Sequence, residues 1–181
     1  MLYDWIAYTD GACFNNGQRQ AKGGWGLFFR NNDYRNEIGW VAGPQTNQRN
    51  ELAPILRLMQ LAFQEQKDSV LVYSDSKYAK FVVHDDLGIY SWKRNGWLKT
   101  SGKDVSNQDI LRPLANLMRQ VDLTVEYVQG HSGIHGNEKA DKMAKYAATI
   151  YHEGVHTNPR TGYPYRSWQP LHSYESASGI F

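Results

Sequence analysis

The spacing of apolar residues changes once along this chain, and that change restricts the possible folds more than any other feature. Up to residue 42 the pattern is typical of strands, rich in aromatic and β-branched side chains and interrupted by Gly, Asn and Asp. From Thr46 onward apolar positions recur at helical spacing, and short apolar strands then alternate with helical stretches. Such a chain is expected to form a sheet with helices packed against it.

Three strands are predicted in the first part of the chain and two in the second. The first three cover residues 5–10, 23–30 and 36–42, and turns join them, so we expect an antiparallel meander. The other two cover residues 70–74 and 123–128. Strands that alternate with helices need crossover connections and should be parallel. The sequence therefore predicts an α/β fold, a five-stranded mixed sheet in the order 3-2-1-4-5 flanked by helices.

The helical patterns cover residues 46–66, 77–84 and 107–119. Thr46 is the expected N-cap of the first of these helices. Pro54 lies inside it and lacks a backbone donor, so a kink is expected near Asn50.

The length of 181 residues suits one domain with a sizeable core, and we expect that domain to cover residues 1–149. Residues 150–181 form an extension that is rich in aromatic side chains, which solvated tails usually lack. We expect this extension to pack on the domain or to contact another chain. The alternative is an untethered end.

Composition points to an intracellular protein. The single cysteine, Cys13, excludes an internal disulfide framework and fits a reducing compartment. No basic segment followed by an apolar run opens the chain, and no apolar stretch approaches the roughly 18 residues of a membrane helix. We expect a cytoplasmic monomer that does not contact a membrane.

Two carboxylates follow predicted strands. Asp10 is expected to end the first strand and Asp75 follows the fourth. If these two strands are neighbours, the two side chains lie side by side at the edge where α/β sheets usually bind ligands. The alternative is structural: Asp10 before Gly11 is common in turns, and Asp75 before a helix is a common cap.

Two further acidic residues favour a functional interpretation. Glu51 lies close to the buried stripe of the predicted helix, where an unpaired carboxylate is costly, and Asp141 lies in the first turns of the last helix. Four converging carboxylates repel one another unless cations lie between them. Oxygen ligands suit Mg²⁺ or Mn²⁺, and two such ions ~4 Å apart are a known arrangement for phosphodiester cleavage.

Five short motifs, taken together, resemble type 1 ribonuclease H. They are Tyr8-Thr-Asp-Gly11, Gln45-Thr-Asn-Gln-Arg-Asn-Glu-Leu52, Tyr73-Ser-Asp-Ser-Lys-Tyr78, Trp92-Lys-Arg-Asn-Gly-Trp97 and Gly130-His-Ser-Gly-Ile-His-Gly-Asn-Glu-Lys-Ala-Asp141. Each is weak alone, but all five occur in the family's order with comparable spacing. The resemblance covers residues 3–148.

The resemblance implies metal-dependent, endonucleolytic hydrolysis of the RNA strand in an RNA–DNA hybrid. The residues that match the family's metal ligands are Asp10, Glu51, Asp75 and Asp141. His131 matches a loop histidine that assists proton transfer or product release. Histidine is a residue type that can exchange protons near neutral pH, and glycines near His131 on both sides favour movement. The alternative is a histidine that only caps or fills the loop.

Residues 90–103 interleave cations with aromatic side chains, as in a protrusion that binds nucleic acid. The cations are Lys93, Arg94, Lys99 and Lys103. We expect Trp92 to contact the nucleic acid and Trp97 to anchor the segment to the domain. The alternative is a solvated helix and turn held by its tryptophans.

The resemblance also implies a pocket for a phosphate of the DNA strand, with Thr46 and Asn107 as members. Pro44 stands where relatives often have Arg, so the pocket is expected to be weaker or to be completed by another cation such as Arg49. Tyr78 matches an aromatic residue of the DNA channel.

At a further position of that channel, where relatives often carry another aromatic residue, this chain has Gly88, which predicts a less extensive channel. On the RNA side the matching residues are Asn16, Asn47 and Gln48, together with backbone atoms from Cys13 to Asn15. These positions imply recognition of 2′-hydroxyls in the minor groove.

Two other functional classes remain open from the sequence. One is another two-metal nuclease or integrase-like polynucleotidyl transferase on the same fold, and the second is a hybrid-binding module without catalysis. The four carboxylates disfavour the second, and the Trp92–Trp97 motif disfavours the first. A domain of a reverse transcriptase is a further variant.

Overall fold

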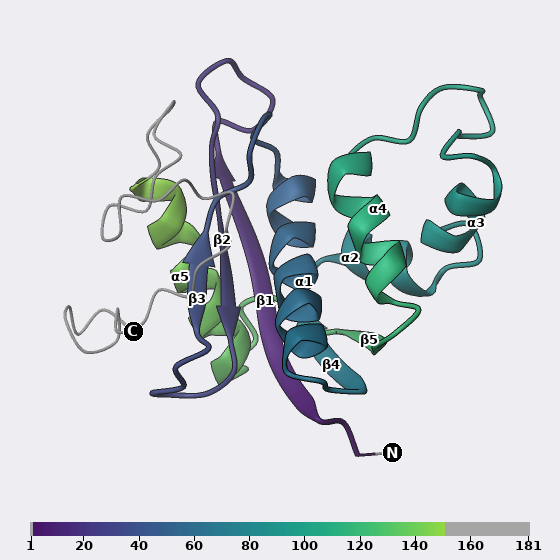
Figure 1. Cartoon of the computed structure of the whole chain (residues 1–181). Coiled ribbons are helices and arrows are strands. Elements are labelled where there is room, and N and C mark those ends of the chain that lie inside the picture. The colour runs from purple at the N-terminus through teal and green to yellow at the C-terminus, as the bar shows by residue number, and fades with distance from the viewer. Residues whose placement is uncertain (1, 151–181) are drawn as a thin grey trace.

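A computed structural model describes residues 2–150, and the predicted extension beyond residue 150 lies outside the described residues. Five strands form one sheet in the order β3-β2-β1-β4-β5, which confirms the predicted order (Figure 1). The strands are β1 (Trp5–Phe14), β2 (Lys22–Phe28), β3 (Glu37–Gly39), β4 (Ser69–Ser74) and β5 (Asp122–Tyr127). The helices are α1 (Asn47–Gln64), α2 (Lys77–His84), α3 (Ile89–Arg94), α4 (Gln108–Leu117) and α5 (His135–Thr149).

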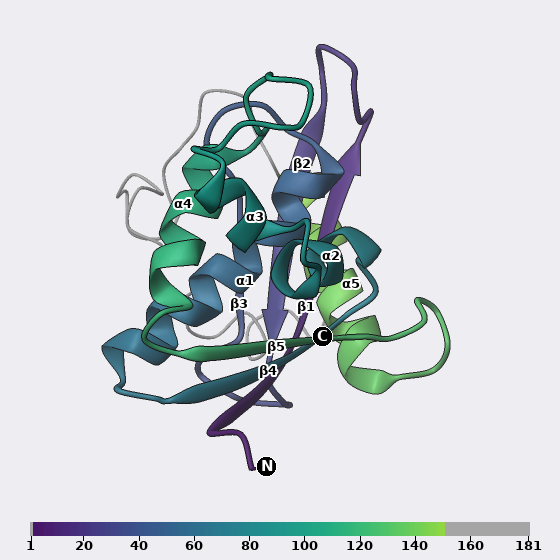
Figure 2. The same ribbon diagram turned by 90° about the vertical axis from the view of Figure 1, so that its right-hand side faces the viewer.

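The sheet has an antiparallel half and a parallel half. β1, β2 and β3 pair antiparallel, whereas β4 pairs parallel with both β1 and β5. Figure 2 shows the twist that separates the direction of β1 from that of β4 and β5. The change from one pairing type to the other falls between β1 and β4.

β1 is longer than the sequence predicts. Pairing with β4 ends at Tyr8, which lies opposite Tyr73, but antiparallel pairing with β2 continues from Tyr8 to Phe14. The prediction that Asp10 and Gly11 end the strand as a turn is therefore wrong. The cause is β2, whose backbone continues to bond this part of β1 although the local sequence reads as a turn.

α1 and α5 cover opposite faces of the sheet (Figure 1). α1 begins at the predicted cap, because the hydroxyl of Thr46 accepts a hydrogen bond from the Arg49 backbone N at 3.2 Å. The larger core cluster lies between the sheet and α1 and continues to α4; among its fully buried side chains are Trp25, Leu52 and Leu111.

The smaller core cluster lies under α5. It comprises Phe28, Ile38, Ala140, Met143 and Ala147. Gly26 of β2 allows the helix to lie close to the strand, since an added Cβ would stand 2.6 Å from the carbonyl oxygen of Ala140. This close approach brings α5 against the centre of the sheet.

α3 is a short helix that the sequence analysis did not predict as a separate element. Gly88 precedes it and is buried; a Cβ there would stand 2.6 Å from the carbonyl oxygens of Phe81 and Val82. Packing thus gives a reason for glycine at this position. Within residues 2–150, none of the helices is both long and apolar enough to span a bilayer.

Candidate active site

Asp10 is the centre of an acidic cluster, which we define as Asp10, Glu51, Asp75 and Asp141. It lies two residues beyond the last β1 residue paired with β4, and its Oδ1 accepts a hydrogen bond from the Gly11 backbone N at 2.7 Å. Burial raises the pKa of Asp10 to about 8; the charges of Asp75, Asp141 and Glu51 also raise it, while the Gly11 N–H lowers it. The charges of the other three predicted carboxylates therefore act on Asp10.

Glu51 enters the cluster from α1. Gly11 makes this possible, because a side chain there would overlap the backbone of Asn50 and Glu51. The Ser76 hydroxyl donates a hydrogen bond to Glu51 Oε2 at 2.5 Å. Burial raises the pKa of Glu51, the bond from Ser76 lowers it, and the charge of Asp75 raises it. One oxygen of Glu51 is thus already engaged.

Asp75 follows β4 but does not cap α2. Ser76 is the cap, since its Oγ accepts a hydrogen bond from the Ala79 backbone N at 3.0 Å. The Asp75 carboxylate instead accepts a bond of 3.3 Å from Asn137 Nδ2 on α5. A Cβ on Gly130 would stand 2.6 Å from Asp75 Oδ2. The capping interpretation of Asp75 is therefore wrong, and its carboxylate faces α5 and the loop before it.

Asp141 lies on α5, one turn beyond Asn137. Its Oδ2 forms an ion pair with Lys145 Nζ at 2.8 Å, an i,i+4 pair along the helix. Asp141 is half-buried, whereas Lys145 is exposed.

The donor set suits a hard divalent ion, because it offers carboxylate oxygens in a site where their charges repel. Within residues 2–150, however, no three acidic, histidine or cysteine side chains are gathered closely enough to hold a metal ion as they stand. Glu51 Oε2 accepts the hydrogen bond from Ser76, and Asp141 Oδ2 pairs with Lys145.

His131 lies in the loop between β5 and α5. It is exposed, and its backbone has a positive φ of 54°, as does Gly133 with 82°. Its neighbour Gly130 packs so closely on Asp75 that an added Cβ would stand 2.6 Å from Asp75 Oδ2. The loop therefore runs beside the acidic cluster. The exposure of His131 argues against a ring that fills the loop, and its role in the reaction stays a prediction.

Sequence reasoning missed the partners that hold these carboxylates. Ser76 and Asn137 are both buried, and both contact a carboxylate of the cluster. A signal for Asn137 was present, because it lies four residues before Asp141 and therefore on the same face of a helix. No comparable signal existed for the bond from Ser76, whose partner is 25 residues away.

The family model described as RNase H matches residues 3–149 of the chain. The chain belongs to the RNase H family. It is similar to the ribonuclease H of Francisella philomiragia subsp. philomiragia, with 38% identity over 142 residues, 78% of this chain and 89% of the relative. It is equally similar to the ribonuclease H of Syntrophomonas wolfei subsp. wolfei, with 38% identity over 143 residues, 78% of this chain and 94% of the relative. The chain is therefore an endoribonuclease.

Solved structures share the fold. The foamy viral protease-reverse transcriptase in complex with an RNA/DNA hybrid matches 83% of this chain with a TM-score of 0.69 and 18% identity, and the match takes in 21% of that longer chain. LC9-RNase H1, a type 1 RNase H with the type 2 active-site motif, matches 80% of this chain and 71% of its own, with a TM-score of 0.62 and 24% identity. These structures show the RNase H fold.

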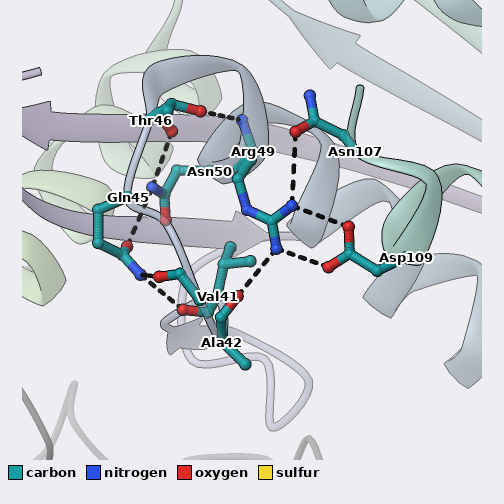
Figure 3. Close-up of polar contacts among 9 residues, drawn as sticks. Val41, Ala42, Gln45, Thr46, Arg49, Asn50, Asn107 and Asp109 are labelled. Atoms are coloured by element: carbon teal, nitrogen blue, oxygen red, sulfur yellow. Dashed lines mark hydrogen bonds and ion pairs between the residues drawn. The ribbon is translucent and has the colours of Figure 1, made fainter. Parts of the chain in front are cut away.

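Arg49 lies beside the two residues that the RNase H resemblance assigns to a DNA-phosphate pocket, Thr46 and Asn107 (Figure 3). Its guanidinium donates to the carboxylate of Asp109 at 2.8 and 2.6 Å, and to the carbonyl oxygen of Ala42 at 2.8 Å. The pKa of Asp109 is lowered by these contacts. The charge of Arg49 is thus already paired, which argues against Arg49 as the cation that replaces the missing Arg at Pro44 and favours the weaker pocket.

The aromatic residues of the predicted DNA channel and of the cationic segment have mixed roles. Tyr78 is half-buried and hydrogen-bonded to Asn107, and burial raises its pKa. Trp92 is half-buried against Phe81, with 5.9 Å between ring centroids. Trp97 is buried, which confirms its predicted anchoring role. The cations predicted to meet phosphates are exposed; they are Lys93, Arg94, Lys99 and Lys103.

The residues assigned to the RNA side gather near the start of α1. Asn16 Oδ1 accepts a hydrogen bond from the Asn47 backbone N at 3.3 Å, and Asn47 and Gln48 are exposed. Asn15 has a positive φ of 55°, which turns the chain after β1. Burial raises the pKa of the Cys13 thiol, which disfavours a nucleophilic role.

Proposed function

We propose that this chain hydrolyses the RNA strand of RNA–DNA hybrids endonucleolytically, with two Mg²⁺ ions per site or Mn²⁺ as a substitute. Membership of the RNase H family and two relatives named ribonuclease H support the reaction. A solved structure with the same fold contains an RNA/DNA hybrid. The single observation that carries the proposal is Asp10, whose pKa is raised to about 8 in the company of three other carboxylates.

The acidic cluster would hold the ions. When bound, they lower the pKa of a water nucleophile and stabilise charge on the leaving oxygen. Asp10 and Asp75 offer oxygens from neighbouring strands, while Glu51 and Asp141 reach the same place from α1 and α5. Ser76 orients Glu51 and Asn137 orients Asp75. This chain thus supplies four carboxylate ligands from separate parts of the fold. It also supplies the two side chains that orient Glu51 and Asp75.

His131 would carry a proton on its imidazole ring at the edge of the cluster. Its exposed position lets the ring exchange protons with solvent, and the positive φ values of His131 and Gly133 place it on a sharply turned loop. Recognition of the RNA strand would come from Asn16, Asn47 and Gln48, whose amides can bond 2′-hydroxyls. Lys93, Arg94 and Lys99 would bind phosphates.

The test is a strand-labelled cleavage assay on matched RNA–DNA, RNA–RNA and DNA–DNA duplexes, with Mg²⁺ or with a chelator. We expect cutting of the RNA in the hybrid alone, and only with metal. Asp75→Asn should still bind the hybrid but should cut it at least about 10³-fold more slowly, because one ligand of the ions is lost.

Other outcomes of the same assay have a defined meaning. Cutting of duplex DNA would move the chain to the integrase-like class. Hybrid binding by the unaltered chain without any cutting would contradict catalysis and leave a recognition module. Full activity of Asp75→Asn would overturn the assignment of the acidic cluster.

A further inference from the structure

The hairpin formed by β1 and β2 carries positive charges, and the sequence around its turn contains no acidic residue. Residues 11–32 contain Arg19, Lys22 and Arg30 and no Asp or Glu. Arg30 pairs with Asp33 at 3.3 Å. Arg19 and Lys22 are exposed, and neither forms an ion pair with another residue of the described range 2–150. Two cations of this hairpin are therefore available to a partner.

The tip of this hairpin has a defined shape. Asn15 and Gly17 adopt positive φ values of 55° and 80°, and the backbone N of Gln18 donates to the carbonyl oxygen of Asn15 at 2.9 Å. A second turn follows, in which the backbone N of Ala21 donates to the carbonyl oxygen of Gln18 at 3.1 Å. Arg19 lies between these two turns and Lys22 begins β2.

The hairpin is also held in place relative to the acidic cluster. Asn16 bonds the first residue of α1, Asn47, which lies about one helical turn before Glu51. At the base of the hairpin, Gly23 packs so closely on Gln45 and Asn50 that a side chain there would overlap them. The cations therefore stand at a fixed place beyond Asp10.

The length of β1 beyond Asp10 gives the distance from the acidic cluster to the start of the hairpin turn. β1 runs four residues from Asp10 to Phe14, and at ~3.3 Å per residue this part spans about 13 Å. Successive steps of a duplex are ~3.4 Å apart along its axis, so about 13 Å corresponds to about four nucleotides. The hairpin and the loop between α3 and α4 project from the same end of the molecule (Figures 1 and 2).

We propose that Arg19 and Lys22 form a cationic arm that binds the sugar–phosphate backbone of the hybrid about four to six nucleotides from the cleaved bond. This inference rests on the proposed function, because it assumes a hybrid centred on the acidic cluster. It adds a contact surface on the antiparallel side of the sheet, distinct from the segment of Lys93, Arg94 and Lys99.

The test compares hybrid binding by the full chain and by Arg19→Gln/Lys22→Gln across a range of salt concentrations, with a chelator present. Loss of two phosphate contacts should weaken binding about 10-fold and lower the slope of log K against log salt by about 2. Arg19→Lys/Lys22→Arg keeps both charges and should keep the slope. Arg119→Gln removes an exposed cation just after α4 and should change neither quantity.

A second arm of the experiment locates the contact. One hybrid carries uncharged methylphosphonate linkages about four to six nucleotides from the cleavage position. The unaltered chain should bind it more weakly than the unmodified hybrid, whereas the double Gln variant should bind both hybrids equally. Equal weakening of both proteins would overturn the proposed location. An unchanged salt slope in the double Gln variant would overturn the arm and leave two solvated surface charges.

The proposed function can fail separately. If the unaltered chain cuts the same labelled hybrid in Mg²⁺ while the salt slopes stay equal, the arm is wrong and the ribonuclease assignment stands. If the unaltered chain neither binds nor cuts the hybrid, the proposed function fails and the arm fails with it.

Discussion

Asp10 and Glu37 are two carboxyl groups of the same sheet whose pKa values are raised in different surroundings. Glu37 on β3 is 2% exposed and faces Arg57 of α1, whose Nε lies 2.9 Å from its Oε2. Burial raises the pKa of Glu37 to about 7, against the opposing effect of Arg57. The neighbours of Asp10 are other acids, and they add to the effect of burial and raise its pKa to about 8.

A raised pKa alone does not distinguish a functional carboxylate from a structural one. The sign of the neighbouring charges distinguishes the two. Arg57 compensates the charge of Glu37 within the fold, whereas the acids around Asp10 are compensated only when cations bind. We therefore assign Glu37 and Arg57 to stability and Asp10 to the reaction.

The sharpest test of this contrast is Asp10→Asn. We expect cleavage to fall about 10³- to 10⁴-fold, since a ligand of the ions is lost. The free energy of unfolding measured with a chelator should rise by about 1–3 kcal/mol, since a buried charge is removed and its repulsion with the other acids is relieved. Glu37→Gln serves as the matched control and should keep its cleavage rate. A loss of stability in Asp10→Asn would contradict an unfavourable burial of the Asp10 charge among the other acids.

Arg57→Met should have the next largest effect. It leaves Glu37 buried without its partner and should lower the free energy of unfolding by about 3–5 kcal/mol in urea denaturation at pH 8. The double variant Glu37→Leu/Arg57→Met removes both charges and should recover most of that loss. If the single and double variants are equally unstable, the ion pair is not the cause.

The pH dependence of stability gives a smaller effect. Glu37 has a pKa of 4.5 as its reference value and about 7 in the fold. The folded protein therefore binds more protons than the unfolded chain between these values, so stability falls as pH rises from 4.5 to 7. We expect Glu37 to contribute about 1–3 kcal/mol to this fall. Urea denaturation of Glu37→Gln should lack that contribution, and a curve parallel to that of the unaltered chain would contradict it.

Ser76→Ala should have the smallest effect on stability. Loss of the α2 cap should cost about 1 kcal/mol. Loss of the bond to Glu51 should also raise the Mg²⁺ concentration needed for half-maximal cleavage, because one ligand is no longer oriented. Ser76→Thr keeps the hydroxyl and should restore both. An unchanged Mg²⁺ requirement in Ser76→Ala would limit Ser76 to capping.

Several features of the fold were predictable because they depend on local patterns. The meander, the parallel half, the cap at Thr46 and the bounds of α2 all follow from periodicity and capping within a few residues. The end of β1 was not, because the pairing that continues it beyond Asp10 comes from β2. α3 is only six residues long and too short to show a period.

The candidate site divides in the same way. The types of side chain in the five motifs were enough to name the acidic cluster, His131 and the asparagines near α1. The hydrogen-bond partners of the site side chains depend on elements that are distant in sequence and meet only in the fold. Arg49 is paired with Asp109, 60 residues away, and Glu51 with Ser76, 25 residues away.

By itself, the sequence determined the kind of sheet, the chemistry of the cluster and the family. Local spacing dictates which faces of a helix or strand are buried, and side-chain type dictates which ions and hydrogen bonds a residue favours. The tertiary structure alone decided that Asp10 lies within a strand, that Ser76 and Asn137 hold two of the carboxylates, and that Asp109 takes the charge of Arg49. These contacts depend on how closely distant elements pack, which no local pattern encodes.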